Sequence, residues 1–298
     1  MQEKITYEKF VRERVDTYLA SMYKDFSRSY FQKLINKQKV FVNNKIVVSS
    51  YRLRHKDIII FEFEKEQKSQ IKSENICIDV LYEDDDIVVI NKQVGIVVHP
   101  SYGHTSGTLL NALIAHSEGK YNPYLVHRLD KDTSGVIIFA KNEKSKISIS
   151  KQLQKRSVKK MYFAVVKGII VENKGRIDAP LGRAPHNRKL ISVNPLAKKK
   201  AITEFKVVSR KNGYTLVEVR IITGRTHQIR SHMKYINHPI VGDRQYGGPE
   251  MINGKYFGRQ MLHAHNIALI HPTTLKVVNF TAELPRDIKE IFENLYFQ

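Results

Sequence analysis

Apolar positions in the first part of the chain follow two helical repeats and then short runs separated by turn residues. The repeats are Val15, Tyr18, Leu19 and Met22, then Tyr30, Phe31, Leu34 and Ile35. This spacing places each set on one helical face, and Ser27 is the expected N-cap of the second helix. The runs 39–42 and 45–47 flank Asn43-Asn44, which tolerates a left-handed backbone, so they predict a hairpin, and residues 58–63 predict a further strand. We therefore expect a small α/β domain over residues 12–63.

Residues 64–75 interrupt this pattern. They contain almost no apolar side chains and show no helical repeat, although apolar blocks lie on both sides. A polar segment of this kind cannot bury enough surface to order itself. It is predicted to be a linker between two domains.

The rest of the chain is dominated by short runs rich in β-branched and aromatic residues. Strands are predicted at 78–81, 87–90, 137–140, 161–166, 203–208 and 215–222. Two helical repeats, around 109–113 and 229–236, interrupt them without regular strand–helix alternation. The overall expectation is an α+β protein whose larger domain, residues 76–290, is built around a mostly antiparallel or mixed sheet.

Composition supports an ordinary core and an intracellular setting. Hydrophobic residues make up 42% of the chain, and the single cysteine, Cys77, stands between two isoleucines and is predicted to be a small core residue. Because no apolar run approaches the ~20 residues of a membrane span, we expect a protein of the cytoplasm. Residues Glu293–Gln298 match what a viral protease site leaves after cleavage and are set aside as a remnant.

The charge indicates a polyanionic partner. The net charge is +21 and the pI about 9.8, and residues 151–200 alone hold 14 Lys and Arg against Glu172 and Asp178. Such a surface attracts nucleic acid and raises its encounter rate. The alternative is a general lysine bias, which the clustering of the charge disfavours.

Residues Val126–Gly135 place Asp130 among cations. Histidine and arginine precede it, Lys131 follows, and a turn of Asp, Thr, Ser and Gly leads into an apolar strand. Nearby cations favour the charged form of a carboxylate, which an acid working beside an anionic substrate needs. For an arbitrary aspartate, a surface ion pair before a core strand would be the ordinary interpretation.

Four stretches resemble the RluA family of pseudouridine synthases. They are HRLDKDTSG at 127–135, NKQVGIVVHP at 91–100, KMYFAVVKG at 160–168 and ITGRTHQIRSHM at 222–233. The resemblance implies that Asp130 is the catalytic residue, that Tyr162 stacks on the flipped base or relays a proton, and that Arg225 pairs with Asp130. Arg230 is the alternative partner for that pair.

The same resemblance implies contacts with RNA. Arg128 would occupy the space that the flipped nucleotide leaves, with His127 and Arg230 also on the RNA side of the site. Residues 27–35 and 40–43 are similar to the small RNA-binding domain named after ribosomal protein S four. Its basic helix would carry Arg28, Lys33 and Lys37 to the RNA, and the protein would be a monomer.

No metal and no cofactor are expected. His227 and His232 are five residues apart and do not share a helical face, and His263 and His265 lack a third ligand nearby in the sequence. Residues 84–86, three consecutive aspartates, lie between predicted strands without a neighbouring histidine, which favours a solvated turn.

The sequence therefore predicts an isomerase that converts uridine to pseudouridine in structured RNA, most simply large-subunit ribosomal RNA. One carboxylate suffices because the leaving base is retained and re-added, with neither water nor an oxidant. Whether Asp130 adds to the anomeric carbon or removes the neighbouring sugar proton is open. A catalytically silent RNA-binding assembly factor, a synthase for transfer RNA and an enzyme for free nucleotides are the alternatives.

Overall fold

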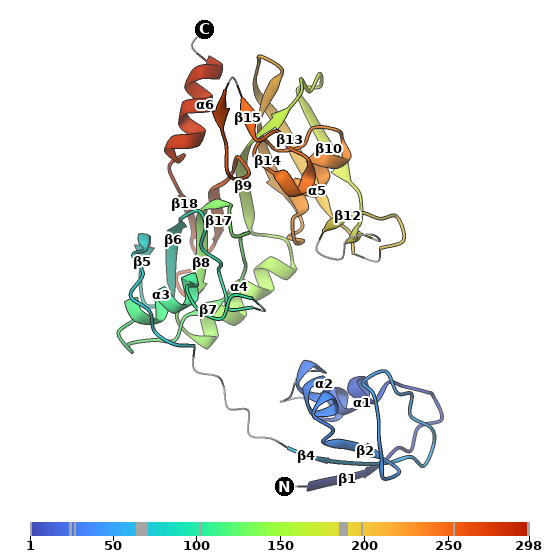
Figure 1. Cartoon of the computed structure of the whole chain (residues 1–298). Helices are drawn as coiled ribbons and strands as arrows, with labels where there is room; N and C mark the ends of the chain where they lie inside the picture. Colours follow the sequence, from blue (N-terminus) through green and yellow to red (C-terminus); the bar gives the residue numbers. More distant parts are fainter. Residues whose placement is uncertain are drawn as a thin grey trace. The chain divides into compact units, whose positions relative to one another are not determined.

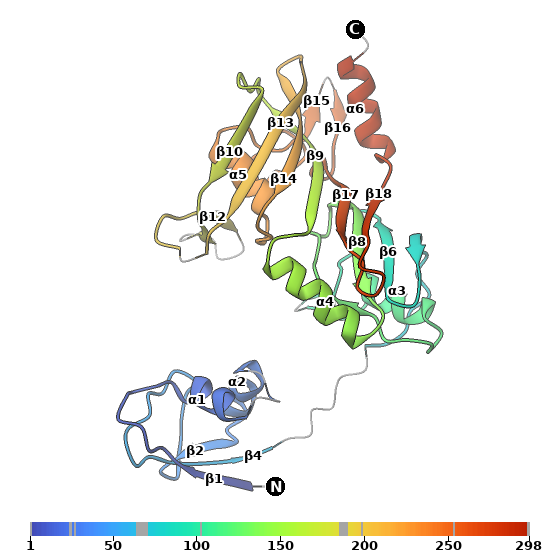
Figure 2. The same cartoon turned by 180° about the vertical axis from the view of Figure 1, so that it is seen from behind.

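The computed structural model describes residues 2–23, 26, 28–63, 71–101, 103–184, 190–197, 199–252 and 254–296, with the backbone alone at residues 2 and 292–296. The chain divides into two compact units, residues 1–70 and 71–298 (Figures 1 and 2). The predicted N-cap, Ser27, lies outside the described residues. Each unit has a hydrophobic core of its own.

The N-terminal unit packs two helices on a four-stranded sheet. Helices α1 (Val15–Met22) and α2 (Arg28–Asn36) bury the apolar side chains that the sequence predicts, except Met22, which is 54% exposed at the end of α1. The sheet order is β1-β4-β2-β3, with bounds Gln2–Thr6, Ile58–Glu62, Val40–Val42 and Lys45–Ile46. Strand β1 lies before the predicted start of this domain at residue 12 and pairs antiparallel with β4. The predicted hairpin is confirmed, with Asn43 and Asn44 at φ 50° and 61°.

The predicted linker is too long at its C-terminal end. Ile71 packs against the core of the second unit, the Asn111 side chain donates to the Lys72 carbonyl (2.8 Å), and the Glu74 N–H donates to the Asn111 carbonyl (3.2 Å). Residues 71–75 are therefore docked on α3 (Leu109–His116). The Glu74 side chain also accepts from the Gly107 N–H (2.9 Å). The polar composition of the segment does not reveal these contacts, because most of them use backbone groups and a single isoleucine.

The second unit is built on a ten-stranded sheet. Its main path is β10-β13-β14-β9-β17-β8-β6-β5, and β18 and β7 pair with β17 and β8. In chain order the strands are β5 (Asp79–Glu83), β6 (Ile87–Lys92), β7 (Tyr124–Leu125), β8 (Ser134–Ala140), β9 (Lys159–Lys167), β10 (Lys174–Asp178), β13 (Ile202–Lys211), β14 (Tyr214–Ile221), β17 (Leu262–Ile270) and β18 (Val277–Thr281). Among the strand pairs of this sheet in the described residues, β8 and β17 alone run parallel, so the prediction of a mostly antiparallel or mixed sheet is confirmed.

Helices cover both faces of this sheet because β6 and β8 alternate their apolar side chains between them. Val88 and Ile137 face a core that includes α3 and α5 (Gln228–Tyr235), whereas Val89 and Ile138 face α4 (Glu143–Gln154). Helix α6 (Arg286–Tyr296) closes the chain and runs into the predicted protease-site remnant.

Short elements complete the unit around the sheet. They are the hairpins β11 (Leu181–Arg183) with β12 (Ile191–Val193) and β15 (Met251–Ile252) with β16 (Lys255–Tyr256), and the one-turn helix η1 (Arg244–Tyr246).

The core prediction for Cys77 is also wrong. Cys77 is exposed, because the segment before β5 runs along the surface and its flanking isoleucines are only half-buried. Among the described residues, no helix is long and apolar enough to cross a bilayer.

Candidate active site

The loop that carries Asp130 is fixed at its end by Gly135. Gly135 has φ 109° and pairs with Ala264 of β17 where the two strands meet in parallel. A Cβ at this position would lie 2.1 Å from the Ala264 carbonyl oxygen, so only glycine fits without moving the backbone. The loop's glycine is therefore required by the close approach of β17.

Lys92, the last residue of β6, ties the loop to the segment that follows β6. Its ammonium group is 1% exposed and donates to the carbonyls of Gln93 (2.7 Å), Ile96 (3.1 Å) and Lys131 (2.8 Å). Burial lowers the pKa of Lys92 to about 7. In the charged form all three of its protons are engaged by these carbonyls, so Lys92 holds the loop that carries Asp130 and is not available to a substrate.

Asp130 pairs with Arg230, not with Arg225. The Arg230 Nη1 atom lies 3.1 Å from Asp130 Oδ2, and two further nitrogens of the guanidinium bind Asp243 at 2.7 and 2.8 Å. The preferred prediction of an Arg225–Asp130 pair is wrong, and the alternative, Arg230, is observed. Arg230 is the third residue of α5 and points inward from the first turn, and the contacts with two carboxylates raise its pKa although burial opposes the shift.

Arg225 is exposed and its Nε atom donates to the Lys200 carbonyl (3.1 Å). It lies in a turn that Gln228 holds: the Gln228 side chain accepts from the Thr223 hydroxyl (2.7 Å) and from the Arg225 N–H (3.0 Å). The N-cap residue of α5 is His227, whose side chain makes no capping hydrogen bond. This turn leaves Arg225 at the surface, whereas Arg230, further along on α5, points towards Asp130.

His227 faces Asp130 in a fixed orientation. Its backbone is left-handed (φ 50°), and its Nε2 atom lies 4.0 Å from Asp130 Oδ1. Its Nδ1 atom is 3.0 Å from the Tyr246 hydroxyl, which already accepts from the Ile191 N–H and donates to the Ile191 carbonyl. Nδ1 must therefore carry a proton and donate it to Tyr246. Burial lowers the pKa of His227, so its Nε2 presents a lone pair towards the site.

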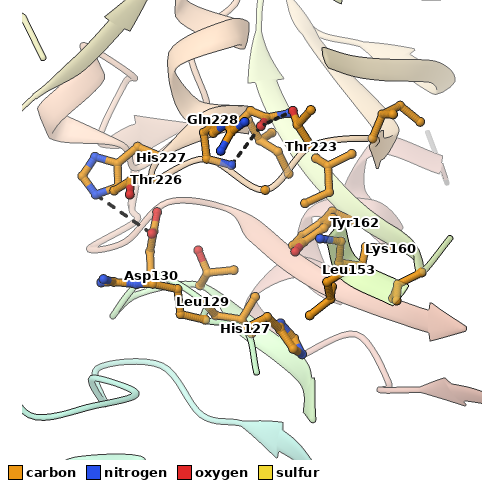
Figure 3. Close-up of a pocket in the computed structure, with 18 of the residues that line it drawn as sticks. His127, Leu129, Asp130, Leu153, Lys160, Tyr162, Thr223, Thr226, His227 and Gln228 are labelled. Carbon is orange, nitrogen blue, oxygen red and sulfur yellow. Dashed lines mark hydrogen bonds and ion pairs between the residues drawn. The ribbon is translucent and has the colours of Figure 1, made fainter. Parts of the chain in front are cut away.

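A cavity of about 450 Å³ opens beside Asp130. Asp130 and Tyr162 lie on opposite sides of it, and Lys160 lies next to Tyr162 (Figure 3). Lys160 and Tyr162 both come from β9, and because they are two residues apart they lie on the same face of the strand. Tyr162 is 6% exposed, and burial, with Asp130 contributing, raises its pKa, so its hydroxyl remains protonated. Burial also lowers the pKa of Lys160.

A second cavity, of about 350 Å³, lies on the other side of Asp130 and shares Arg128, Leu129, Asp130, His227 and Arg230 with the first. Asp130 therefore stands at the junction of two spaces. Arg128 is exposed and borders both cavities. His127 instead accepts from the Ile138 N–H through Nε2 (3.1 Å), and burial lowers its pKa to about 3. Its ring is neutral and supports the loop.

Several site residues were not predicted from the sequence. Lys160 had a readable signal, because it is two residues from Tyr162 on a strand. Asp243 and Tyr246 had none, since they lie in and beside the one-turn helix η1 and reach the site only through tertiary folding. The remaining predicted RNA contacts lie on α2 and just after it: Arg28 binds the buried Asp16 at 3.0 Å, Lys33 is exposed on the helix, and Lys37 is exposed in the turn that follows.

The acidic turn has a histidine neighbour that the sequence does not reveal. Among the described residues, Asp84, Asp86 and His271 form one group with metal-ligand spacing. His271 accepts from the Thr274 N–H at Nδ1 and donates to Asp84 at Nε2 (2.8 Å), and Asp86 accepts from the Ser145 hydroxyl (2.6 Å). These hydrogen bonds explain why the three side chains lie close together: they stabilise the turn.

Comparison with known proteins identifies the class. A family model described as RNA pseudouridylate synthase matches residues 86–235, and an S4 domain model matches residues 13–59. The fold and the site are thus those of an RNA-modifying isomerase with an RNA-binding domain. The chain belongs to the RluA family of RNA pseudouridine synthases, enzymes that convert uridine to pseudouridine in RNA.

Relatives match almost the whole chain. "Uncharacterized RNA pseudouridine synthase YlyB" of Bacillus subtilis is 41% identical over 289 residues, which cover 95% of this chain and 94% of the relative. "Ribosomal large subunit pseudouridine synthase D" of Pasteurella multocida is 38% identical, covering 95% and 91%. The solved structure of "Human RNA Pseudouridylate Synthase Domain Containing 4" superposes with a TM-score of 0.60 at 25% identity, covering 73% of this chain and 92% of that one.

Proposed function

We propose that the chain isomerises uridine in large-subunit ribosomal RNA in the cytoplasm, with Asp130 as the group that reacts with the ribose. The observation that carries this proposal is the position of Asp130, held by Arg230 at the junction of two cavities and facing Tyr162. The charge-assisted hydrogen bond from Arg230 orients the carboxylate. The relatives named for the large ribosomal subunit support this choice of RNA.

The reaction breaks the bond between N1 of uracil and C1′ and forms the bond between C5 and C1′. If Asp130 adds to C1′, the electron pair of the broken bond goes to N1, and attack by C5 then releases the carboxylate. If Asp130 instead takes the C2′ proton, a glycal forms and the same proton returns later. In both routes C5 loses its proton once it is bonded to C1′ and N1 gains a proton, so the reaction balances without water or a cofactor. Each route uses one carboxylate.

The other residues of the site bind the base, the detached uracil and the RNA backbone. Tyr162 offers a ring for stacking and, because its pKa is raised, a hydroxyl that donates to the base. Because its hydroxyl is protonated, Tyr162 accepts the C5 proton of uracil only if it gives its own proton to another group. Lys160, beside it, supplies a positive charge where negative charge develops on the detached uracil. Arg128, at the rim of both cavities, fills the gap left in the RNA, and Arg225, at the rim of the first, holds phosphate.

The test is a pseudouridine map of ribosomal and transfer RNA from cells without the gene, complemented with the wild type or with Asp130→Asn. The proposal expects one or a few positions in large-subunit RNA to be lost without the gene and restored by the wild type alone. Loss at transfer RNA positions would make that RNA the substrate. Full restoration by Asp130→Asn would refute the role of Asp130.

A further inference from the structure

An exposed aromatic stack stands out on the N-terminal unit. The Phe10 side chain is 86% exposed, and its ring lies on His55 with centroids 4.1 Å apart and planes at 19°. The stack covers part of the Phe10 ring and leaves most of it in solvent. Single exposed apolar side chains are common on protein surfaces; the features that point to a partner here are the ordered ring stack and the cations beside it.

The backbone beneath the stack is firmly held. The segments that carry the two rings pair through Tyr7 N–H to the Asp57 carbonyl and Lys56 N–H to the Tyr7 carbonyl, both 2.8 Å, and Tyr7 is buried. His55 donates from Nδ1 to the Glu8 carbonyl (3.1 Å), which sets the plane of its ring. The two rings are therefore presented in a pre-arranged geometry, which lowers the entropy lost on binding.

A row of arginines leads to this stack from α2. Arg28 and Arg14 both bind the buried Asp16, at 3.0 and 2.9 Å. Arg14 forms a β-bridge with Arg52, whose guanidinium donates to the Arg12 carbonyl (3.3 Å), two residues from Phe10. Within the described part of the unit, Arg12 and Arg52, like Arg54 and Lys56 beside His55, are exposed and form no ion pair.

We propose that Phe10 and His55 form a stacking platform for an unpaired base of the RNA substrate, with Arg12 and Arg52 binding the adjoining phosphates. Every base has a π face, so an exposed ring among cations suits single-stranded RNA. An apolar protein surface docked on the ring would leave the surrounding arginine and lysine charges without partners. The inference rests on the proposed function and adds an RNA contact within the N-terminal unit, away from the reacting sugar.

The experiment measures the affinity of the full-length chain for a transcript of large-subunit ribosomal RNA. Phe10→Ala should weaken binding about 5- to 100-fold, the range for loss of one base–ring stack. Phe10→Leu should weaken it nearly as much because it keeps apolar bulk without a π face, while Phe10→Tyr should bind like the wild type. Val11→Ala is the matched control, since this neighbouring side chain is 74% exposed and apolar and should not matter.

Two further readouts separate stacking from charge and from catalysis. Phe10→Ala should leave the slope of log affinity against log salt unchanged, whereas Arg52→Gln should reduce it by about one. Single-turnover rates at saturating RNA should equal the wild-type rate in all of these variants. Ultraviolet cross-linking of the wild type should attach RNA to the peptides that contain Phe10 or His55.

Unchanged affinity of Phe10→Ala would overturn the platform, and so would wild-type affinity of Phe10→Leu, which would indicate an apolar protein contact. Cross-links confined to other peptides would also contradict it. In each of these cases the wild-type protein would still form pseudouridine in this RNA. If the proposed function itself were wrong, the wild-type protein would form no pseudouridine in this RNA.

Discussion

Asp243→Asn tests whether the carboxylate behind Arg230 positions Asp130. The Arg230 and Asp243 side chains are 6% and 1% exposed, and the guanidinium uses Nε and Nη2 on Asp243 while Nη1 reaches Asp130. Asparagine keeps the shape but turns an amide towards one guanidinium nitrogen, which leaves a buried cation short of a partner. Breaking such a pair costs about 3–5 kcal/mol of stability. A shift of Arg230 by about 1 Å would lower the catalytic rate about 100-fold.

Asp287→Asn is the matched control. Asp287 binds Arg259 through the same two nitrogens at 2.7 and 2.8 Å, but it is 39% exposed, and the remaining nitrogen of Arg259 donates to backbone carbonyls. Solvent screening limits its expected cost to about 1 kcal/mol. Urea unfolding gives the stability, and single-turnover pseudouridine formation at saturating RNA gives the rate. Equal rates for the wild type and Asp243→Asn, with the variant folded, would refute the positioning role.

Three further outcomes follow from the structure. Tyr162→Phe should bind RNA normally and react slowly, whereas Tyr162→Ala should lose both; a fully active Phe variant would leave stacking as the sole role. A chain beginning at Ile71 should stay folded, bind RNA with a shallower salt dependence and keep its saturated rate, and an unchanged salt slope would mean that the N-terminal unit does not contact the RNA. The pKa of Lys92, about 7, lies below its unfolded value, so the unfolded chain holds more protons between about pH 7 and 10. Stability should therefore rise with pH across that window, and Lys92→Met should flatten the rise; an equal rise in the variant would contradict the shift.

The sequence identifies the strands and helices whose periodicity is strong, and with them the side chains that one element presents. Asp130 and Tyr162 could be singled out from the sequence because each belongs to a short motif at an apolar strand: Asp130 shortly precedes β8, and Tyr162 lies within β9. The docking of segment 71–75 could not be predicted, because it depends on backbone hydrogen bonds, one isoleucine and one glutamate, which show no periodic pattern in the sequence.

The Arg230 pair shows where sequence reasoning stops. Arg225 and Arg230 flank the start of one helix, and which of them faces inward depends on Gln228 folding back onto the turn. That choice is made by contacts with β13, where Gln228 donates to the Ile202 carbonyl (2.9 Å) and Thr203 hydroxyl (3.0 Å). Asp243 and Tyr246 enter the site in the same way, from segments distant in sequence and without a periodic signal.

The most direct test of the account is a single-turnover measurement with Asp130→Asn on a large-subunit ribosomal RNA transcript, alongside its RNA affinity. The substitution removes the reacting charge and keeps nearly the same shape and every phosphate contact. We expect no pseudouridine from the variant and an affinity within a few-fold of the wild type. Appreciable pseudouridine formation by Asp130→Asn would contradict the assignment of Asp130 as the group that reacts with the ribose.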